Sequence, residues 1–169
     1  MAGANQPKGS VSSGSIKPVT RKAVRCQREV AWLVTQAAGK LVAATDDVNA
    51  PTPSFVLAAA LSYARAQERA ALDAGRAIDY GAVMAPDLPA FCQAAGLPAA
   101  PAALSDAGYM FTLSGADLIR DVYAYCSDLG DRMDSTTEVK PGYAIKLALR
   151  MFLLGETSAA STAADKTSV

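Results

Sequence analysis

Residues 141–154 read PGYAIKLALRMFLL, and this stretch decides the fold. Pro141 can open a helix, because the N–H that proline lacks is one that the first helical turn leaves unpaired. The apolar side chains that follow are spread nearly all around the helix axis: Tyr143, Ile145, Leu147, Leu149, Met151, Phe152, Leu153 and Leu154. A helix with so little polar circumference is expected at the centre of a domain or in an interface.

A second helix is expected over residues 115–129. Ser114 and Asp117 have the spacing of a capping box, in which each side chain satisfies backbone donors at the helix N-terminus. Gly130 is expected to end the helix. Its apolar face consists of Leu118, Val122, Tyr125, Cys126 and Leu129.

Thr52 and Pro53 predict the start of a third helix, as an N-cap followed by proline at the first helical position. The helix should run to about residue 74, with Gly75 just after its end. The side chains expected to face inward are Val56, Leu57, Ala60, Leu61, Ala64, Ala71 and Leu72. Arg65, Glu68, Arg69 and Arg76 are expected outside or beyond the end.

The N-terminal helix is expected over residues 21–44. Helical spacing collects its apolar residues on one side: Val30, Leu33, Val34, Ala37, Ala38 and Leu41. Arg21, Arg25 and Arg28 then lie together on the opposite side as a basic outer stripe, which Lys17 would join if the helix began earlier.

A shorter helix is expected from Asp87 to Ala95, with Phe91 and Cys92 as its packing residues. We find no alternation of apolar residues long enough for a sheet. The sequence therefore predicts an all-α fold, a small helical bundle of about four to five helices. The core would span residues 21–155, between an N-terminal arm (1–20) and a C-terminal tail (156–169).

Length and composition fit one domain, because 169 residues with 51% hydrophobic side chains can form one hydrophobic core but provide too few residues for a second. The net charge is zero, yet residues 1–40 carry seven basic side chains against Glu29 alone, a net charge of +6. The remainder carries −6. This asymmetry predicts that the N-terminal part seeks an anion, either nucleic acid or the acidic surface of another copy.

Several kinds of chemistry lack their usual residues. The chain has no histidine, which removes the common general base and metal ligand. Cys26, Cys92 and Cys126 lack Cys-x-x-Cys spacing and indicate buried thiols of an intracellular protein. The glycine-rich loops that cradle phosphates are also missing. We predict no catalytic residue, no metal and no cofactor.

Membrane insertion and export are not expected. The most apolar stretch, residues 144–154, carries Lys146 and Arg150 and is far shorter than the roughly 20 residues that span a bilayer. The first 15 residues have no apolar segment of the kind found in secretory signals.

Six arginines are candidate nucleic-acid-binding residues. They are Arg21, Arg25 and Arg28 on the basic stripe, and Arg65, Arg69 and Arg76 along or beyond the helix at 53–74. A row of cations suits the phosphates of a polymer better than a small ligand. The competing interpretation is a solvated surface, or ion pairs with the acidic loop of a neighbouring copy.

The order of certain features resembles the coat proteins of flexible filamentous plant viruses. These features are Phe91-Cys92, then Gly108-Tyr109, then residues 118–126 with Tyr123 and Tyr125, about a third of the chain. The resemblance implies a helical core, an RNA groove and arms passed between subunits. The aspartate that this family places inside its aromatic motif is not between Tyr123 and Tyr125 here, and the nearest is Asp121.

The function we expect is therefore that of a self-assembling coat or filament subunit that packages nucleic acid, with RNA as the expected polymer. Its partners would be copies of itself and single-stranded RNA, and no membrane. Two alternatives stay open. One is a helical adaptor that binds a protein through the apolar last helix, and the other is a histidine-free enzyme that uses carboxylates such as Asp117 and Asp121.

Overall fold

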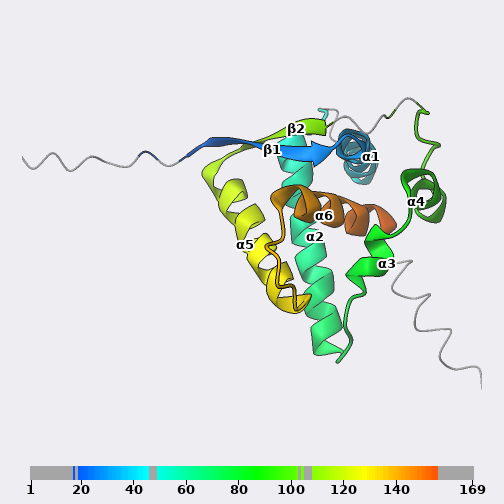
Figure 1. Ribbon diagram of the computed structural model, residues 1–169. Coiled ribbons are helices and arrows are strands. Elements are labelled where there is room, and N and C mark those ends of the chain that lie inside the picture. Colours follow the sequence, from blue (N-terminus) through cyan, green and yellow to red (C-terminus); the bar gives the residue numbers. More distant parts are fainter. Residues whose placement is uncertain (1–16, 18, 46–48, 103, 105–107, 156–169) are drawn as a thin grey trace, which may run out of the picture.

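The computed structural model describes residues 17, 19–45, 49–102, 104 and 108–155, and the structural statements below concern these residues. Most of the predicted arms, residues 1–16, 18 and 156–169, lie outside them. The described chain forms six helices and two strands (Figure 1). In chain order they are β1 (Arg21–Gln27), α1 (Glu29–Ala44), α2 (Pro53–Asp73), α3 (Tyr80–Met84), α4 (Leu88–Ala94), β2 (Gly108–Ser114), α5 (Ala116–Arg132) and α6 (Pro141–Leu154).

Helix α6 forms the centre of the molecule, as its apolar circumference predicts. It packs against α1, α2, α3, α5 and β1, and it crosses the middle of the helical array in Figure 1. Leu147 and Leu149 are fully buried, and Leu153 is nearly so. The remaining helices cover α6 because it offers apolar surface on nearly every side.

Local signals correctly placed α2 and α4. The Thr52 hydroxyl accepts a hydrogen bond from the Phe55 N–H (3.2 Å), and Gly75 follows α2 with a positive φ of 65°. Asp87 caps α4 by accepting from the Ala90 N–H (2.9 Å). These caps form because they satisfy backbone donors that the first turn of a helix leaves free.

The last turns of α2 differ from the prediction. Glu68 is buried instead of exposed, because Tyr125 and Arg132 of α5 bind its carboxylate. Leu72 is 72% exposed and Ala71 only half-buried, so the inward positions predicted there are wrong. The buried residues of α2 end at Glu68, and the last turn of the helix extends beyond the core.

The predicted helical fold is confirmed in the coarser sense that the described chain is mainly helical, but it is not strictly all-α, because it contains a small antiparallel sheet. Strand β1 pairs with β2 in the register that joins Arg21 to Ser114 and Gln27 to Gly108. Residues 21–27 are thus not helical, and α1 starts only at Glu29. Val24 and Cys26 alternate inward on the strand, and pairing with a distant segment outweighs the helical periodicity that continues into α1.

Helix α5 buries the five predicted apolar residues, but its ends differ from the prediction. Ser114 is the last residue of β2, and its N–H donates to Ser54 Oγ (3.1 Å), so Gly115 takes the N-cap position without a side-chain cap. At the other end the helix runs through Gly130 to Arg132. The short helix α3 was not predicted, which brings the number of helices in the described residues to six.

Candidate nucleic-acid interface

Strands β1 and β2 form a ribbon that lies across one end of the helical core (Figure 1). Its inner face presents Val24, Cys26, Phe111 and Leu113, all buried. Lys22 and Tyr109 alternate to the same inner side. The outer face, as alternation along each strand requires, carries the remaining eight residues, and all of them are exposed. They are Arg21, Ala23, Arg25 and Gln27 of β1 and Gly108, Met110, Thr112 and Ser114 of β2.

Arg21 and Arg25 are the only charged residues of this outer face. They are four residues apart on the strand, which separates their Cα atoms by about 13 Å. The guanidinium of Arg25 lies against Gly108, where an added methyl group would come within 3.0 Å of Arg25 Nε. Neither arginine forms an ion pair with another described residue.

The ribbon is strongly basic. Between residues 17 and 28 the sequence has five basic side chains and no acidic one, and β2 has no charged residue. Lys22 lies over the ring of Tyr123, with Nζ 4.4 Å from the ring centroid. A surface with several cations and no counter-charge produces a positive potential that attracts anions.

The basic stripe exists, but its geometry is not the predicted one. Arg21 and Arg25 share one face of a strand instead of a helix. Arg28 follows the strand at the N-cap position of α1 and is exposed. The structure therefore places Arg21 and Arg25 on one face of a strand and Arg28 in the turn that follows it.

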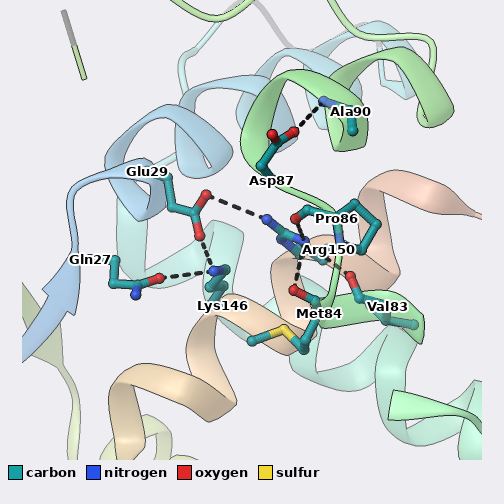
Figure 2. A network of polar contacts seen from close by, with 9 residues as sticks. All are labelled: Gln27, Glu29, Val83, Met84, Pro86, Asp87, Ala90, Lys146 and Arg150. Atoms are coloured by element: carbon teal, nitrogen blue, oxygen red, sulfur yellow. Dashed lines mark hydrogen bonds and ion pairs between the residues drawn. The ribbon is translucent and has the colours of Figure 1, made fainter. Parts of the chain in front are cut away.

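A charge cluster built around the buried Arg150 anchors the end of β1 to α6 (Figure 2). Lys146 Nζ donates to the side-chain oxygen of Gln27 (2.8 Å) and forms an ion pair with Glu29. Gly142 lies so close to the β1 backbone that an added methyl group would be 2.6 Å from the Arg25 carbonyl oxygen. Helix α6 thus holds the ribbon through close backbone contact and through Lys146.

Arg150 is the centre of this cluster, with a side chain 1% exposed. It pairs with Glu29 (3.4 Å) and donates to the carbonyls of Val83 (3.1 Å), Met84 (3.4 Å) and Pro86 (2.8 Å), as Figure 2 shows. Its guanidinium also lies 4.6 Å from the ring centroid of Phe91. Sequence reasoning missed this role, although a charged residue inside an otherwise apolar helix was a signal for a buried partner.

The arginines of α2 have a different environment. Arg65 forms an ion pair with Asp128 (2.7 Å), and its guanidinium lies 5.2 Å from the ring centroid of Tyr125. Arg69 and Arg76 are exposed, with Asp73 between them in sequence. The structure does not bring this second group to the ribbon, because α2 meets the ribbon with its first turn and extends away from it (Figure 1).

A polar cluster joins α2 to α5. Tyr125 donates to Glu68 (2.7 Å), and Arg132 pairs with the same carboxylate. Burial, together with the charge of Glu68, raises the pKa of Tyr125 far above its usual value, and burial also raises the pKa of Tyr80. Both phenols stay protonated near neutral pH, so this cluster holds the helices together as a set of fixed donors and acceptors.

The paired carboxylates Asp117 and Asp121 both bind Arg120, at 3.2 and 3.5 Å. Both are exposed surface ion pairs. In the described ranges no group of three or more acidic or cysteine side chains could hold a metal ion. The three cysteines are buried thiols, as expected, and form no disulfide. Burial raises the pKa of Cys26 and Cys126 to about 11.

No helix in the described part of the chain is long and apolar enough to cross a membrane. The chain matches no family model, no curated protein and no solved structure.

Proposed function

We propose that the chain is a self-assembling structural subunit, of the coat or filament kind, that holds single-stranded nucleic acid on the outer face of its ribbon. RNA is the polymer we favour, in line with the resemblance to coat proteins. One observation carries the proposal: five basic residues and no acid occur between positions 17 and 28, three of the five belong to the ribbon, and its two outward arginines have no ion-pair partner among the described residues.

The spacing of these arginines suits a polymer. Arg21, Arg25 and Arg28 extend along one strand and the turn after it, so they can meet successive parts of a sugar–phosphate chain. Each neutralised phosphate releases condensed counterions, which favours binding without regard to sequence. No aromatic side chain belongs to the outer face, so phosphate contacts rather than base stacking supply the affinity.

The ribbon is a better candidate than α2. A phosphate that approached Arg65 would have to compete with the 2.7 Å ion pair to Asp128, whereas Arg21 and Arg25 need not break any contact of that kind. Among the predicted residues, we therefore assign the nucleic-acid contact to Arg21, Arg25 and Arg28.

The adaptor alternative has little support, because the apolar side chains of α6 are covered by α1, α2, α3, α5 and β1 of its own chain. The carboxylate enzyme has none from Asp117 and Asp121, which share Arg120 in exposed surface ion pairs.

A triple substitution tests the proposal. Arg21→Gln, Arg25→Gln and Arg28→Gln together should weaken binding to a single-stranded RNA oligonucleotide. The log–log dependence of affinity on salt should flatten by roughly 0.7 for each lost phosphate contact. The matched control changes Arg65, Arg69 and Arg76 to Gln and should alter the slope much less. Equal slopes for the wild type and the ribbon variant would remove the proposal.

Assembly without nucleic acid is measured on the same variants. If the ribbon variant loses assembly but keeps its RNA affinity, the ribbon binds the acidic surface of a neighbour and not nucleic acid.

A further inference from the structure

Exposed apolar side chains gather at two opposite ends of the molecule. Of the six large apolar residues that are exposed in the described chain, three lie at the ribbon and two where α2 and α5 end. Single exposed apolar residues are ordinary on a protein surface, but groups rimmed by charge are typical of contact sites.

The first group lies at the end of the ribbon where β1 begins. Val19 is 63% exposed and Phe55 61%. The Gly115 N–H donates to the Thr20 carbonyl (2.8 Å), and Ser54 Oγ accepts from the Ser114 N–H, which holds both residues beside the last residue of β2. We call Val19 and Phe55 the head surface.

The second group lies at the C-terminal ends of α2 and α5. Leu72 is 72% exposed and Met133 38%. Glu68, one turn before Leu72, pairs with Arg132, the neighbour of Met133, so the two residues lie at the same end of the molecule. We call Leu72 and Met133 the tail surface.

The charges around the two surfaces have opposite sign. The head surface is flanked by Lys17, Arg21 and Lys22, whereas the nearby Asp117 and Asp121 share Arg120. The tail surface is flanked by three exposed acidic residues, Asp73, Asp131 and Asp134. Two exposed cations without an ion pair among the described residues, Arg69 and Arg76, lie within four positions of Leu72, and Arg132 is already bound to Glu68, so the acidic charges are in excess by one.

We infer that the tail surface of one copy docks on the head surface of a second copy. The inference deepens the assembly part of the proposed function and rests on it. Apolar residues would meet apolar residues in the middle, and the acidic rim of the tail would face the basic rim of the head. Like charges make head-to-head and tail-to-tail contacts unfavourable.

The two surfaces cannot meet within one molecule. Phe55 and Leu72 lie near opposite ends of α2, 17 residues apart in sequence and about 25 Å apart along a helix. A contact between different surfaces leaves one free head and one free tail on every dimer. Such a heterologous contact continues into a ring or an open filament, as a coat or filament subunit requires.

Two single substitutions test the inference by sedimentation velocity. Phe55→Glu removes the head and Leu72→Glu removes the tail, and each variant alone should sediment as a monomer. An equimolar mixture should form a 1:1 dimer, because one wild-type head and one wild-type tail remain. Val42→Glu, at an exposed apolar position on α1 outside both surfaces, is the matched control and should assemble like the wild type. Circular dichroism confirms that each variant is folded.

The inference is overturned if the wild type is monomeric with and without RNA, if either variant still assembles, or if the mixture stays monomeric. RNA affinity is recorded for the same samples. If the wild type does not bind RNA but the two variants still form the 1:1 dimer when mixed, only the nucleic-acid proposal is refuted. If the wild type binds RNA but stays monomeric, only the docking is refuted.

Discussion

Replacing Arg150 with methionine should destabilise the fold more than any surface substitution. Arg150 is fully buried, and its guanidinium donates to Glu29 and to three backbone carbonyls at the end of α3 and in the turn before α4. Methionine keeps much of the side-chain volume but provides no donor. This substitution therefore measures the effect of removing the charge and its hydrogen bonds, without the added effect of a large cavity.

The magnitude follows from the contacts. Removing one partner of a buried ion pair costs about 3–5 kcal/mol, because the remaining charge stays buried without compensation. Lys146 still neutralises Glu29 here, which lowers the cost, but the carbonyls of Val83 and Pro86 lose their donor, which adds to it. We therefore expect a loss of about 3–5 kcal/mol, or a fall in Tm on the order of 10 °C.

Urea unfolding followed by far-ultraviolet circular dichroism measures this loss. Lys146→Met is the matched control, because it removes a partly exposed partner of the same carboxylate and leaves Arg150 in place, so it should cost about 1 kcal/mol. A loss below about 1 kcal/mol for Arg150→Met would refute the view that this cluster organises the core.

Three further predictions concern the core, the ribbon and pH. Truncation to alanine at any one of three buried leucines of α6 should cost about 2–5 kcal/mol in denaturant unfolding; they are Leu147, Leu149 and Leu153. Gly108→Ala should displace the Arg25 guanidinium and weaken RNA binding, whereas Gly130→Ala, with no neighbour within 4 Å, should leave binding unchanged. Burial raises the pKa of Cys26 and Cys126 from 9.0 to about 11 in the folded protein. Below pH 9.0 both thiols are protonated in the folded and the unfolded chain, whereas above it the unfolded chain releases these protons first and becomes more favourable. Stability should therefore fall between pH 9.0 and about 11, and mutation of both cysteines to alanine should flatten that part of the pH profile.

The helices could be predicted because their signals are local. Thr52, Asp87 and Pro141 each mark a helix start within a few residues of the segment that they cap, and the apolar face of α5 has a regular spacing. The ribbon was missed because its strands are separated by some 80 residues, and β1 contributes only Val24 and Cys26 to the buried face. So short an alternation cannot be distinguished from the helix that follows it.

The charged clusters could not be predicted for a related reason. Glu29 pairs with Arg150, and Glu68 pairs with Arg132. The partners are far apart in sequence, and only the packing of α6 and α5 brings them together. The sequence predicted an outer face for Arg21 and Arg25, but on a helix instead of a strand. The strand geometry that places Arg21 and Arg25 on the same face required a pairing that the sequence does not reveal.

The central claim is that nucleic acid lies along the outer face of the ribbon. Backbone amide chemical shifts, recorded by NMR while a short single-stranded RNA is added, test it most directly. The account predicts the largest changes in residues 21–28 and 108–114, and small changes in residues 65–76. Changes confined to α2, or no change at RNA concentrations that saturate binding, would contradict it.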